Sequence, residues 1–121
     1  MRVVECGSFA SAYAGRLFAD RGADVIKLER PGGDCAREAF PKNFDVGSHK
    51  ISTSFAFFHI NKRFITLDLN SPPGIRLLQA LAGQLDLLLV DEPYSTAFHA
   101  DGTFRRLLGE HPHLVIVAIT P

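Results

Sequence analysis

Apolar residues in this chain fall into short continuous runs separated by stretches in which they recur every third or fourth residue. Runs of this length, rich in β-branched residues, are typical of strands, whereas the longer spacing is typical of one face of a helix. The predicted strands cover residues 3–6, 25–28, 64–69, 87–90 and 114–120, and the predicted helices cover 9–21, 53–61, 71–85 and 103–111. This alternation predicts an α/β fold: an open parallel sheet of about five strands with flanking helices and right-handed crossovers.

Each predicted helix has a set of apolar residues that we expect to face the sheet. The expected inward residues are Phe9, Tyr13 and Leu17, then Phe55, Phe57, Phe58 and Ile60, then Leu77, Leu78, Leu81 and Leu85, and finally Phe104, Leu107 and Leu108. The segment 31–50 opens with Pro, Gly, Gly and Asp, which continue neither helix nor strand, so we expect a long loop there. A loop of that length is usually a binding loop or mobile.

Length and charge exclude several classes of protein. A chain of 121 residues fits one domain, and its 13 basic and 13 acidic residues cancel. The balance argues against a nucleic-acid backbone or an anionic membrane as a partner, so any bound phosphate must be met by local groups. Two cysteines, with no secretory segment and no apolar run long enough to span a bilayer, predict a cytoplasmic protein with free thiols and no zinc site.

Ligands of open parallel sheets bind outside the carboxyl ends of the strands. The first such place is the start of the predicted helix, at Ala10 and Ser11. Backbone N–H groups there lack helical partners, and the small side chains leave room for an anion. The alternative is an ordinary helix start that binds no ligand. The second place is Arg30, whose guanidinium keeps its charge and can clamp a phosphate. Its alternative is a surface salt bridge with Glu29 or Asp34.

Other charged residues near the strand ends carry weaker predictions. Lys62 and Arg63 either reach a bound phosphate or are solvated charges at the end of a helix. Asp91 and Glu92 resemble an acid/base pair, but adjacent residues on an extended loop point apart, so we favour a solvated loop. No G-x-G-x-x-G, P-loop or G-x-S-x-G motif is present, which argues against common dinucleotide, ATP and hydrolase sites.

Two ordered motifs indicate a family. The run Gly22–Pro31 reads GADVIKLERP, and Asn61-Lys62-Arg63 is followed by Ile65–Leu69 and Ser71-Pro72. Together they resemble the N-terminal part of the family III CoA-transferases, which include formyl-CoA transferase, carnitine CoA-transferase and the α-methylacyl-CoA racemases. The resemblance implies that residues 1–121 form a single Rossmann-like domain, the N-terminal half of a larger domain in a longer protein whose relatives form interlocked dimers.

The resemblance also implies a set of CoA-contacting positions. Ala10 and Ser11 stand in the family's Ala-Gly-Pro run beside CoA, and Arg30 matches its CoA-contacting arginine. The segment Leu67, Asp68, Leu69 and Asn70 matches one that lies against CoA through its backbone, with Asn70 replacing a lysine. The family's Glu-Asn-Phe, Pro-Gly and arginine after the fourth strand are not reproduced in this chain.

The resemblance places the catalytic groups of the family beyond residue 121. The transferase nucleophile is an aspartate that forms a mixed anhydride with the acyl group, and the racemase His and Asp pair is also downstream. We therefore expect no catalytic residue and no metal ligand in this chain, and CoA or acyl-CoA as a substrate rather than a covalent cofactor.

These observations lead to one leading interpretation and three alternatives. We expect the CoA-binding N-terminal portion of an enzyme that exchanges CoA between an acyl-CoA and a carboxylic acid, acting as a homodimer or with a missing C-terminal half. The alternatives are an α-methylacyl-CoA racemase-like fragment, a non-catalytic dimerisation or regulatory module, and a generic nucleotide-binding domain. The missing glycine fingerprint disfavours the last of these.

Overall fold

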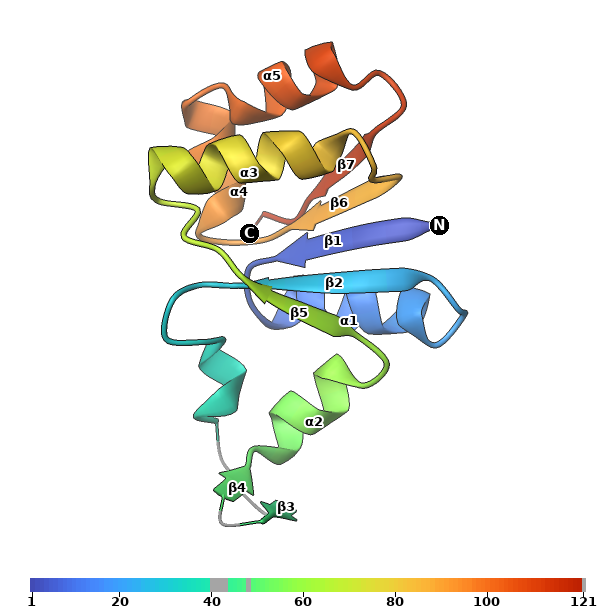
Figure 1. Ribbon diagram of the computed structural model, residues 1–121, viewed down its shortest axis with the longest axis vertical. Coiled ribbons are helices and arrows are strands. Elements are labelled where there is room, and N and C mark those ends of the chain that lie inside the picture. Colours follow the sequence, from blue (N-terminus) through green and yellow to red (C-terminus); the bar gives the residue numbers. More distant parts are fainter. Residues whose placement is uncertain (40–43, 48, 121) are drawn as a thin grey trace.

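A five-stranded parallel sheet forms the centre of the molecule (Figure 1), in a computed structural model that describes residues 1–39, 44–47 and 49–120. The strands are β1 (Arg2–Cys6), β2 (Asp24–Glu29), β5 (Arg63–Thr66), β6 (Leu87–Val90) and β7 (Val115–Ala118). Their order is β5-β2-β1-β6-β7, and every neighbouring pair is parallel. The chain builds one side of the sheet outward from β1 and then returns to build the other side, so the predicted α/β fold is confirmed.

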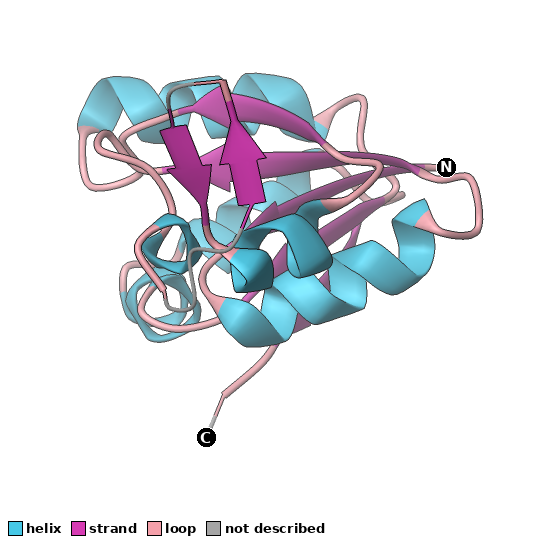
Figure 2. Cartoon of the chain, turned by 90° about the horizontal axis from the view of Figure 1, so that it is seen from below, coloured by secondary structure: helices cyan, strands magenta, loops and turns pink. Residues whose placement is uncertain are grey.

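Helices cover both faces of the sheet (Figure 2). Helix α1 (Phe9–Ala19) packs on one face and contacts α2 (Thr53–His59). Helices α3 (Pro72–Ala82), α4 (Tyr94–Ala100) and α5 (Thr103–Glu110) cover the other face. Helix α4 was not predicted, because its sequence YSTAFHA has too few apolar residues to show helical spacing.

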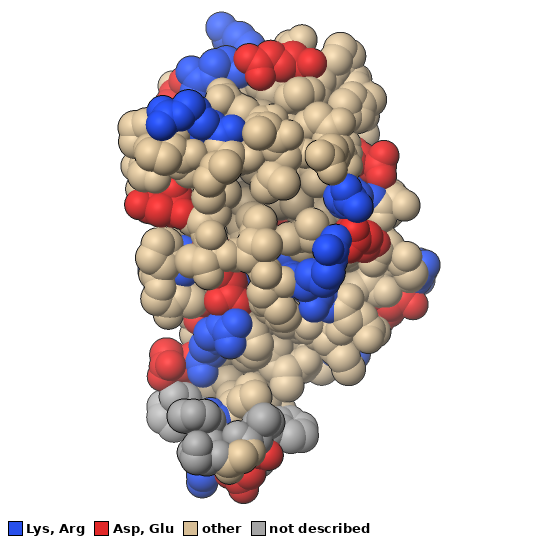
Figure 3. Space-filling model, in the orientation of Figure 1, with Lys and Arg blue, Asp and Glu red and all other residues tan. Residues whose placement is uncertain are grey.

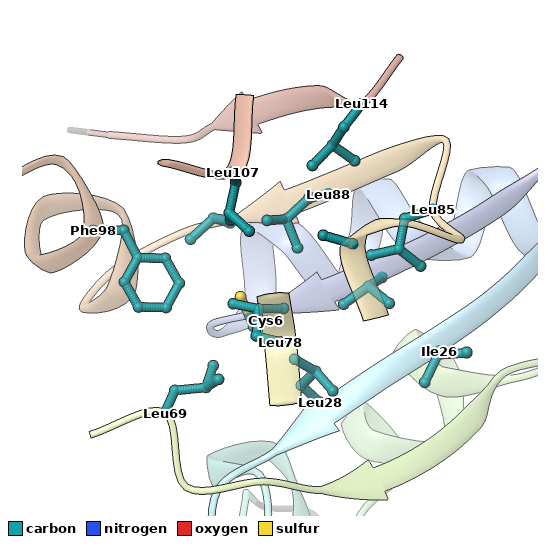
Figure 4. Close-up of a cluster of buried hydrophobic side chains, with 13 residues drawn as sticks. Cys6, Ile26, Leu28, Leu69, Leu78, Leu85, Leu88, Phe98, Leu107 and Leu114 are labelled. Atoms are coloured by element: carbon teal, nitrogen blue, oxygen red, sulfur yellow. The ribbon is translucent and has the colours of Figure 1, made fainter. Parts of the chain in front are cut away.

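The larger hydrophobic cluster lies under α3, α4 and α5 (Figure 4). Leu78, Phe98 and Leu107, one from each helix, meet strand residues that include Leu28 and Leu88. Burial on both faces explains why β6 is apolar at every position. Strand β7 lies at an edge of the sheet, and its Val115 and Val117 are exposed, as expected for a strand without cover.

The predicted inward face of α1 is wrong. Phe9, Tyr13 and Leu17 are 42%, 49% and 42% exposed, whereas Ala12, Gly15 and Ala19 are buried. Helix α1 approaches the sheet so closely that a Cβ on Gly15 would lie 1.7 Å from Oε2 of Glu5 on β1. Only small residues fit at this distance, and the larger ones face outward.

Four more expected core residues are exposed: Phe57, Ile60, Leu77 and Leu108. The correctly predicted Phe55, Leu78 and Leu107 on the same helices are buried, so the predicted apolar faces were too wide.

The segment predicted as one long loop contains short elements. A 3₁₀ turn, η1, spans Cys35–Arg37, and a hairpin joins β3 (Phe44–Val46) to β4 (His49–Ile51) in antiparallel pairing. Gly47 takes a positive φ of 62° between these strands, a conformation that suits glycine in a tight turn. Residues 40–43 and 48, which also suggested the loop, lie outside the described residues.

Charges of both signs are interspersed on the visible surface, without a large basic face (Figure 3). None of the helices in the described ranges combines the length and apolar composition that crossing a bilayer requires.

Candidate functional site

A crevice opens where the strand order reverses, at the carboxyl ends of the strands on the left of Figure 1. Its volume is about 170 Å³, and a larger pocket of about 520 Å³ adjoins it through Asn70 and Tyr94. Four loops supply its walls. The lining residues are Gly7 and Ser8 after β1, Leu28 to Arg30 with Asp34 and Cys35 at and after the end of β2, Asn70 after β5, and Glu92, Pro93 and Tyr94 after β6. This is the position at which open parallel sheets bind ligands.

Arg30 is the exposed cation of this crevice. Its Nε donates a hydrogen bond to the carbonyl of Gly33, 3.1 Å away, which holds the side chain against its own turn. The two carboxylates that could have paired with it are engaged elsewhere: Glu29 by Arg37 at 2.7 Å, and Asp34 by Lys27 at 2.8 Å. Within the described ranges no carboxylate forms an ion pair with Arg30, so the predicted alternative, a salt bridge to Glu29 or Asp34, is not formed.

The two competing carboxylates are firmly held. Arg37 binds Glu29 with both Nε and an NH2 group, and its guanidinium lies 4.0 Å from the centre of the Phe55 ring. Burial opposes ionisation of Asp34, but the hydrogen bond and charge of Lys27 outweigh it and hold the pKa of this carboxyl below its usual range. Both carboxylates are therefore paired with cations other than Arg30.

The start of α1 already holds a carboxylate from the protein. Asp91, which follows β6, is buried and accepts hydrogen bonds from the backbone N–H groups of Ser8 and Ser11, the latter at 2.9 Å. Gly7 has a φ of +126°, and a Cβ there would lie 1.6 Å from Oδ1 of Asp91. The favoured solvated position of Asp91 is therefore wrong. Because β6 lies beside β1, the end of β6 delivers this carboxylate to Ser11 in the first turn of α1, 80 residues earlier in the sequence.

Ala10 and Ser11, the two site residues predicted on α1, differ in burial. Ser11 is buried, and its hydroxyl donates to the carbonyl of Ser8 at 3.2 Å, while Ala10 is exposed. The Ser11 N–H faces Asp91. Neither Ala10 nor Ser11 is among the residues that line the crevice.

The segment after β5 turns sharply before α3. Leu67 donates its N–H to the carbonyl of Glu29 at 2.8 Å, and the Asp68 carboxylate accepts from the N–H of Asn70 at 3.0 Å. Leu69 is buried in the larger cluster, whereas Asn70 is exposed and lines both pockets. The structure therefore brings Arg30 and Asn70 together at one crevice, and leaves the side chains of Leu67, Asp68 and Leu69 outside it.

Lys62 and Arg63 lie away from the crevice. The side chain of Lys62 is fully buried and donates to Glu5 and to the carbonyl of Ala12, each at 2.7 Å. Arg63 pairs with Asp24 at the other end of the sheet. Both predicted roles of Lys62, a phosphate contact and a solvated charge, are wrong because the fold places its ammonium beneath α1.

The sequence analysis assigned no role at the site to three groups of the crevice, Tyr94, Cys35 and Glu92, and it favoured a solvated loop for Glu92. Tyr94 adds a phenol whose pKa burial raises above its usual value, Cys35 adds a thiol, and Glu92 adds a carboxylate that accepts a hydrogen bond from Thr96. The rule that strand ends bind ligands pointed to Tyr94, but no pattern showed which way its side chain turns. No set of three metal-binding side chains gathers in the described ranges.

The chain is similar in sequence and fold to several known proteins. The chain is 33% identical over 121 residues to the cinnamoyl-CoA:phenyllactate CoA-transferase of Clostridium sporogenes, covering 99% of this chain and 29% of that enzyme. It is 32% identical over 125 residues to the succinyl-CoA–D-citramalate CoA-transferase of Chloroflexus aurantiacus, with the same coverage. A CAIB/BAIF family protein from Brucella suis superposes with a TM-score of 0.87 at 30% identity, covering 99% of this chain and 32% of that one.

The chain thus spans less than a third of the length of the relatives that it matches. The model of CoA-transferase family III matches residues 1–121, the whole sequence. Together with the parallel sheet and its crevice, this match shows that the chain belongs to the family III CoA-transferases.

Proposed function

We propose that this chain is the CoA-binding N-terminal portion of an enzyme that exchanges CoA between an acyl-CoA and a carboxylic acid. The observation that carries the proposal is the state of Arg30: an exposed guanidinium at the crevice, fixed by a backbone carbonyl, while the neighbouring carboxylates are paired with other cations. A phosphate of CoA offers two oxygens that can accept the paired hydrogen bonds of the planar guanidinium.

The other groups of the crevice suit the rest of a nucleotide. The amide of Asn70 can donate and accept hydrogen bonds, and Tyr94 offers a ring face with a hydroxyl at its tip. The adjoining larger pocket gives space beyond the crevice for a ligand as long as CoA. CoA is a substrate in this proposal, and the acyl exchange uses an aspartyl anhydride formed on a residue that this chain does not contain.

A second candidate, a non-catalytic module derived from the same fold, is favoured by one specific observation. The carboxylate of Asp91 occupies the start of α1, and Glu92 adds another negative group to the crevice. Both repel a polyanion such as CoA. In this candidate the sheet persists as a dimerisation or regulatory unit, and the chain does not bind CoA.

The proposal also covers the oligomeric state of the protein and its place in the cell. We place the protein in the cytoplasm, with the chain working in a homodimer or joined to a C-terminal half. The exposed edge strand β7 and the outward apolar residues of α1 support a further chain segment or subunit at these surfaces. Sedimentation analysis of the full protein at several concentrations tests the dimer.

The two candidates separate by thermal unfolding with and without CoA. At a CoA concentration 100 times the Kd, binding to the folded state adds about 2.7 kcal/mol to the free energy of unfolding. Arg30→Ala removes at least about half of this gain, as a Kd at least about tenfold weaker requires. Arg105→Ala, at an exposed position of α5 away from the crevice, keeps it. A wild-type protein that CoA does not stabilise overturns the CoA proposal and leaves the non-catalytic module.

A further inference from the structure

Lys27 has an unusual position for a lysine. It lies in the middle of β2, and its side chain is completely buried. Burying an ammonium costs several kcal/mol unless charges and hydrogen bonds compensate for the lost water. The buried carboxylate of Glu5 on β1, 3.8 Å away, supplies part of the compensation, and the two closest contacts come from two loops: Nζ donates to the carbonyl of Gly7 at 2.9 Å and pairs with Asp34 at 2.8 Å.

These two contacts join opposite walls of the crevice. Gly7 belongs to the loop after β1 and Asp34 to the loop after β2, and both residues line the crevice. An apolar residue at position 27 would fill the same interior without joining the loops. Lys27 thus connects the two walls through a single charged atom beneath them.

Hydrogen bonds also link Asp34 to the turn that carries Arg30. The second oxygen of Asp34 accepts from the N–H of Ala36 at 2.7 Å, and the Asp34 N–H donates to Glu29 at 3.3 Å. Between these anchors the turn closes by a hydrogen bond from the Gly33 N–H to the carbonyl of Arg30, at 2.9 Å. The turn that carries the guanidinium is therefore fixed at both ends, and Lys27 holds its far end.

On the other wall, the residue after Gly7 is also held by a hydrogen bond. The next residue, Ser8, donates its N–H to Asp91, the carboxylate at the start of α1. Holding the Gly7 carbonyl thus sets the position of the wall opposite Arg30.

We propose that Lys27 is a positioning residue of the crevice: it sets the distance between the Gly7–Ser8 wall and the Arg30 turn without touching the ligand. This inference rests on the proposed CoA-binding function of the crevice. Its physical consequence is that removing the ammonium loosens both loops and weakens CoA binding, even where the protein remains folded.

Lys62 provides a matched control. It is a second lysine with a fully buried side chain, and it also satisfies one carboxylate and one backbone carbonyl, those of Glu5 and Ala12. Neither of these partners lines the crevice. Lys62→Met therefore removes the nearest cation of a buried carboxylate, as Lys27→Met does, but away from the ligand; Lys27 still lies 3.8 Å from Glu5 in that variant.

The test measures CoA affinity by isothermal titration, at a temperature where each variant is folded by circular dichroism. We expect Lys27→Met to raise the Kd for CoA at least about tenfold, and Lys62→Met to leave it within about twofold. The double variant Lys27→Met/Asp34→Asn removes both charges of the pair. It recovers stability, but its Kd stays high, because nothing joins the walls. If Lys27→Met does not fold, the Kd of the double variant for CoA is compared with that of Lys62→Met instead.

Hydrogen exchange separates failure of this inference from failure of the proposed function. Without CoA, Lys27→Met or the double variant should exchange backbone protons at least about tenfold faster at Gly7–Ser8 and Arg30–Asp34, and Lys62→Met should not. Unchanged exchange at these loops, or equal loss of CoA affinity in Lys27→Met and Lys62→Met, overturns the positioning role. A wild-type protein that does not bind CoA, with the exchange difference present, overturns only the proposed function.

Discussion

Glu5, on β1, is a buried carboxylate that lies among other charged and titratable side chains. Its carboxylate is fully buried, with Lys62 2.7 Å away and Lys27 and His59 at 3.8 and 3.6 Å. Burial raises the pKa of this carboxyl to about 7, even though the Lys62 charge opposes the change. Glu5 has little room to move, so substitutions that press on it should be costly.

Gly15→Ala tests this confinement. The new Cβ would lie 1.7 Å from Oε2 of Glu5, the oxygen that Lys62 holds, so the helix must shift. We expect a loss of about 1 to 3 kcal/mol in the free energy of unfolding, measured by urea denaturation. Gly109→Ala in α5 meets open space and should instead stabilise by about 0.5 to 1 kcal/mol. Equal effects at the two glycines would contradict the close packing of α1.

His59 lies in the same interior, with both ring nitrogens unpaired and the rings of Phe55 and Phe64 at 4.6 and 5.8 Å. Burial lowers its pKa from 6.5 to about 3, helped by the charges of Lys62 and Lys27 and, more weakly, Arg37, while Asp34 acts against them. A lowered pKa contributes stability that is present above pH 6.5 and is lost as the pH falls toward 3. The raised pKa of Glu5 acts with the opposite sign: its contribution is complete below pH 4.5 and is lost as the pH rises through 7.

His59→Phe removes one of these opposed contributions. Relative to wild type, the variant should gain on the order of 1 kcal/mol in stability when the pH is lowered from 7 to 5. Denaturant unfolding of both proteins at the two pH values measures the change, with His99→Phe at an exposed position of α4 as the control. A stability difference between wild type and variant that is the same at pH 7 and pH 5 would show that His59 is not buried as a neutral ring.

At the scale of elements, helix α1 shows what spacing alone can predict. Its helical period, its start and its end near Gly22 follow from the sequence, but the period does not say which face lies toward the sheet. Close approach to a parallel sheet selects small residues, here Ala12, Gly15 and Ala19, over the larger apolar ones. The strands were easier to predict, because burial on both faces makes a run such as Leu87–Val90 uniformly apolar.

A pair of substitutions on α1 tests this orientation. Leu17→Lys lies on the outward face and should change the free energy of unfolding by no more than about 0.5 kcal/mol. Ala12→Leu adds bulk against the sheet and should cost about 1 to 3 kcal/mol. Thermal and urea unfolding of both variants measure the difference. The reverse order would mean that Phe9, Tyr13 and Leu17 form the packed face after all.

The cap of α1 by Asp91 connects two elements far apart in the sequence. Asp91→Ala leaves the N–H groups of Ser8 and Ser11 without their acceptor, so we expect a loss of about 1 to 2 kcal/mol in stability. Glu92→Ala, one residue further along and partly exposed, is the control and should cost less. Stability of Asp91→Ala equal to wild type would show that this carboxylate is not the cap of the helix.

At the scale of the whole molecule, the strand order explains how much of the site could be predicted. The rule for open sheets placed Arg30 at the edge where the crevice opens, and the family resemblance added Asn70, which lines the same crevice. The rule did not predict that β6 lies beside β1, and this neighbour relation brings Asp91 to the start of α1 and Tyr94 to the crevice. The buried contacts of Lys27 and Lys62 depend on tertiary packing that no local pattern contains.

Isothermal titration of the wild-type protein and of Arg30→Ala with CoA measures whether the crevice at Arg30 binds CoA. We expect saturable binding of CoA by the wild type, a Kd at least about tenfold weaker for Arg30→Ala, and an unchanged Kd for Arg105→Ala. Wild-type protein that does not bind CoA, or binding that Arg30→Ala leaves intact, would refute the proposed role of this crevice.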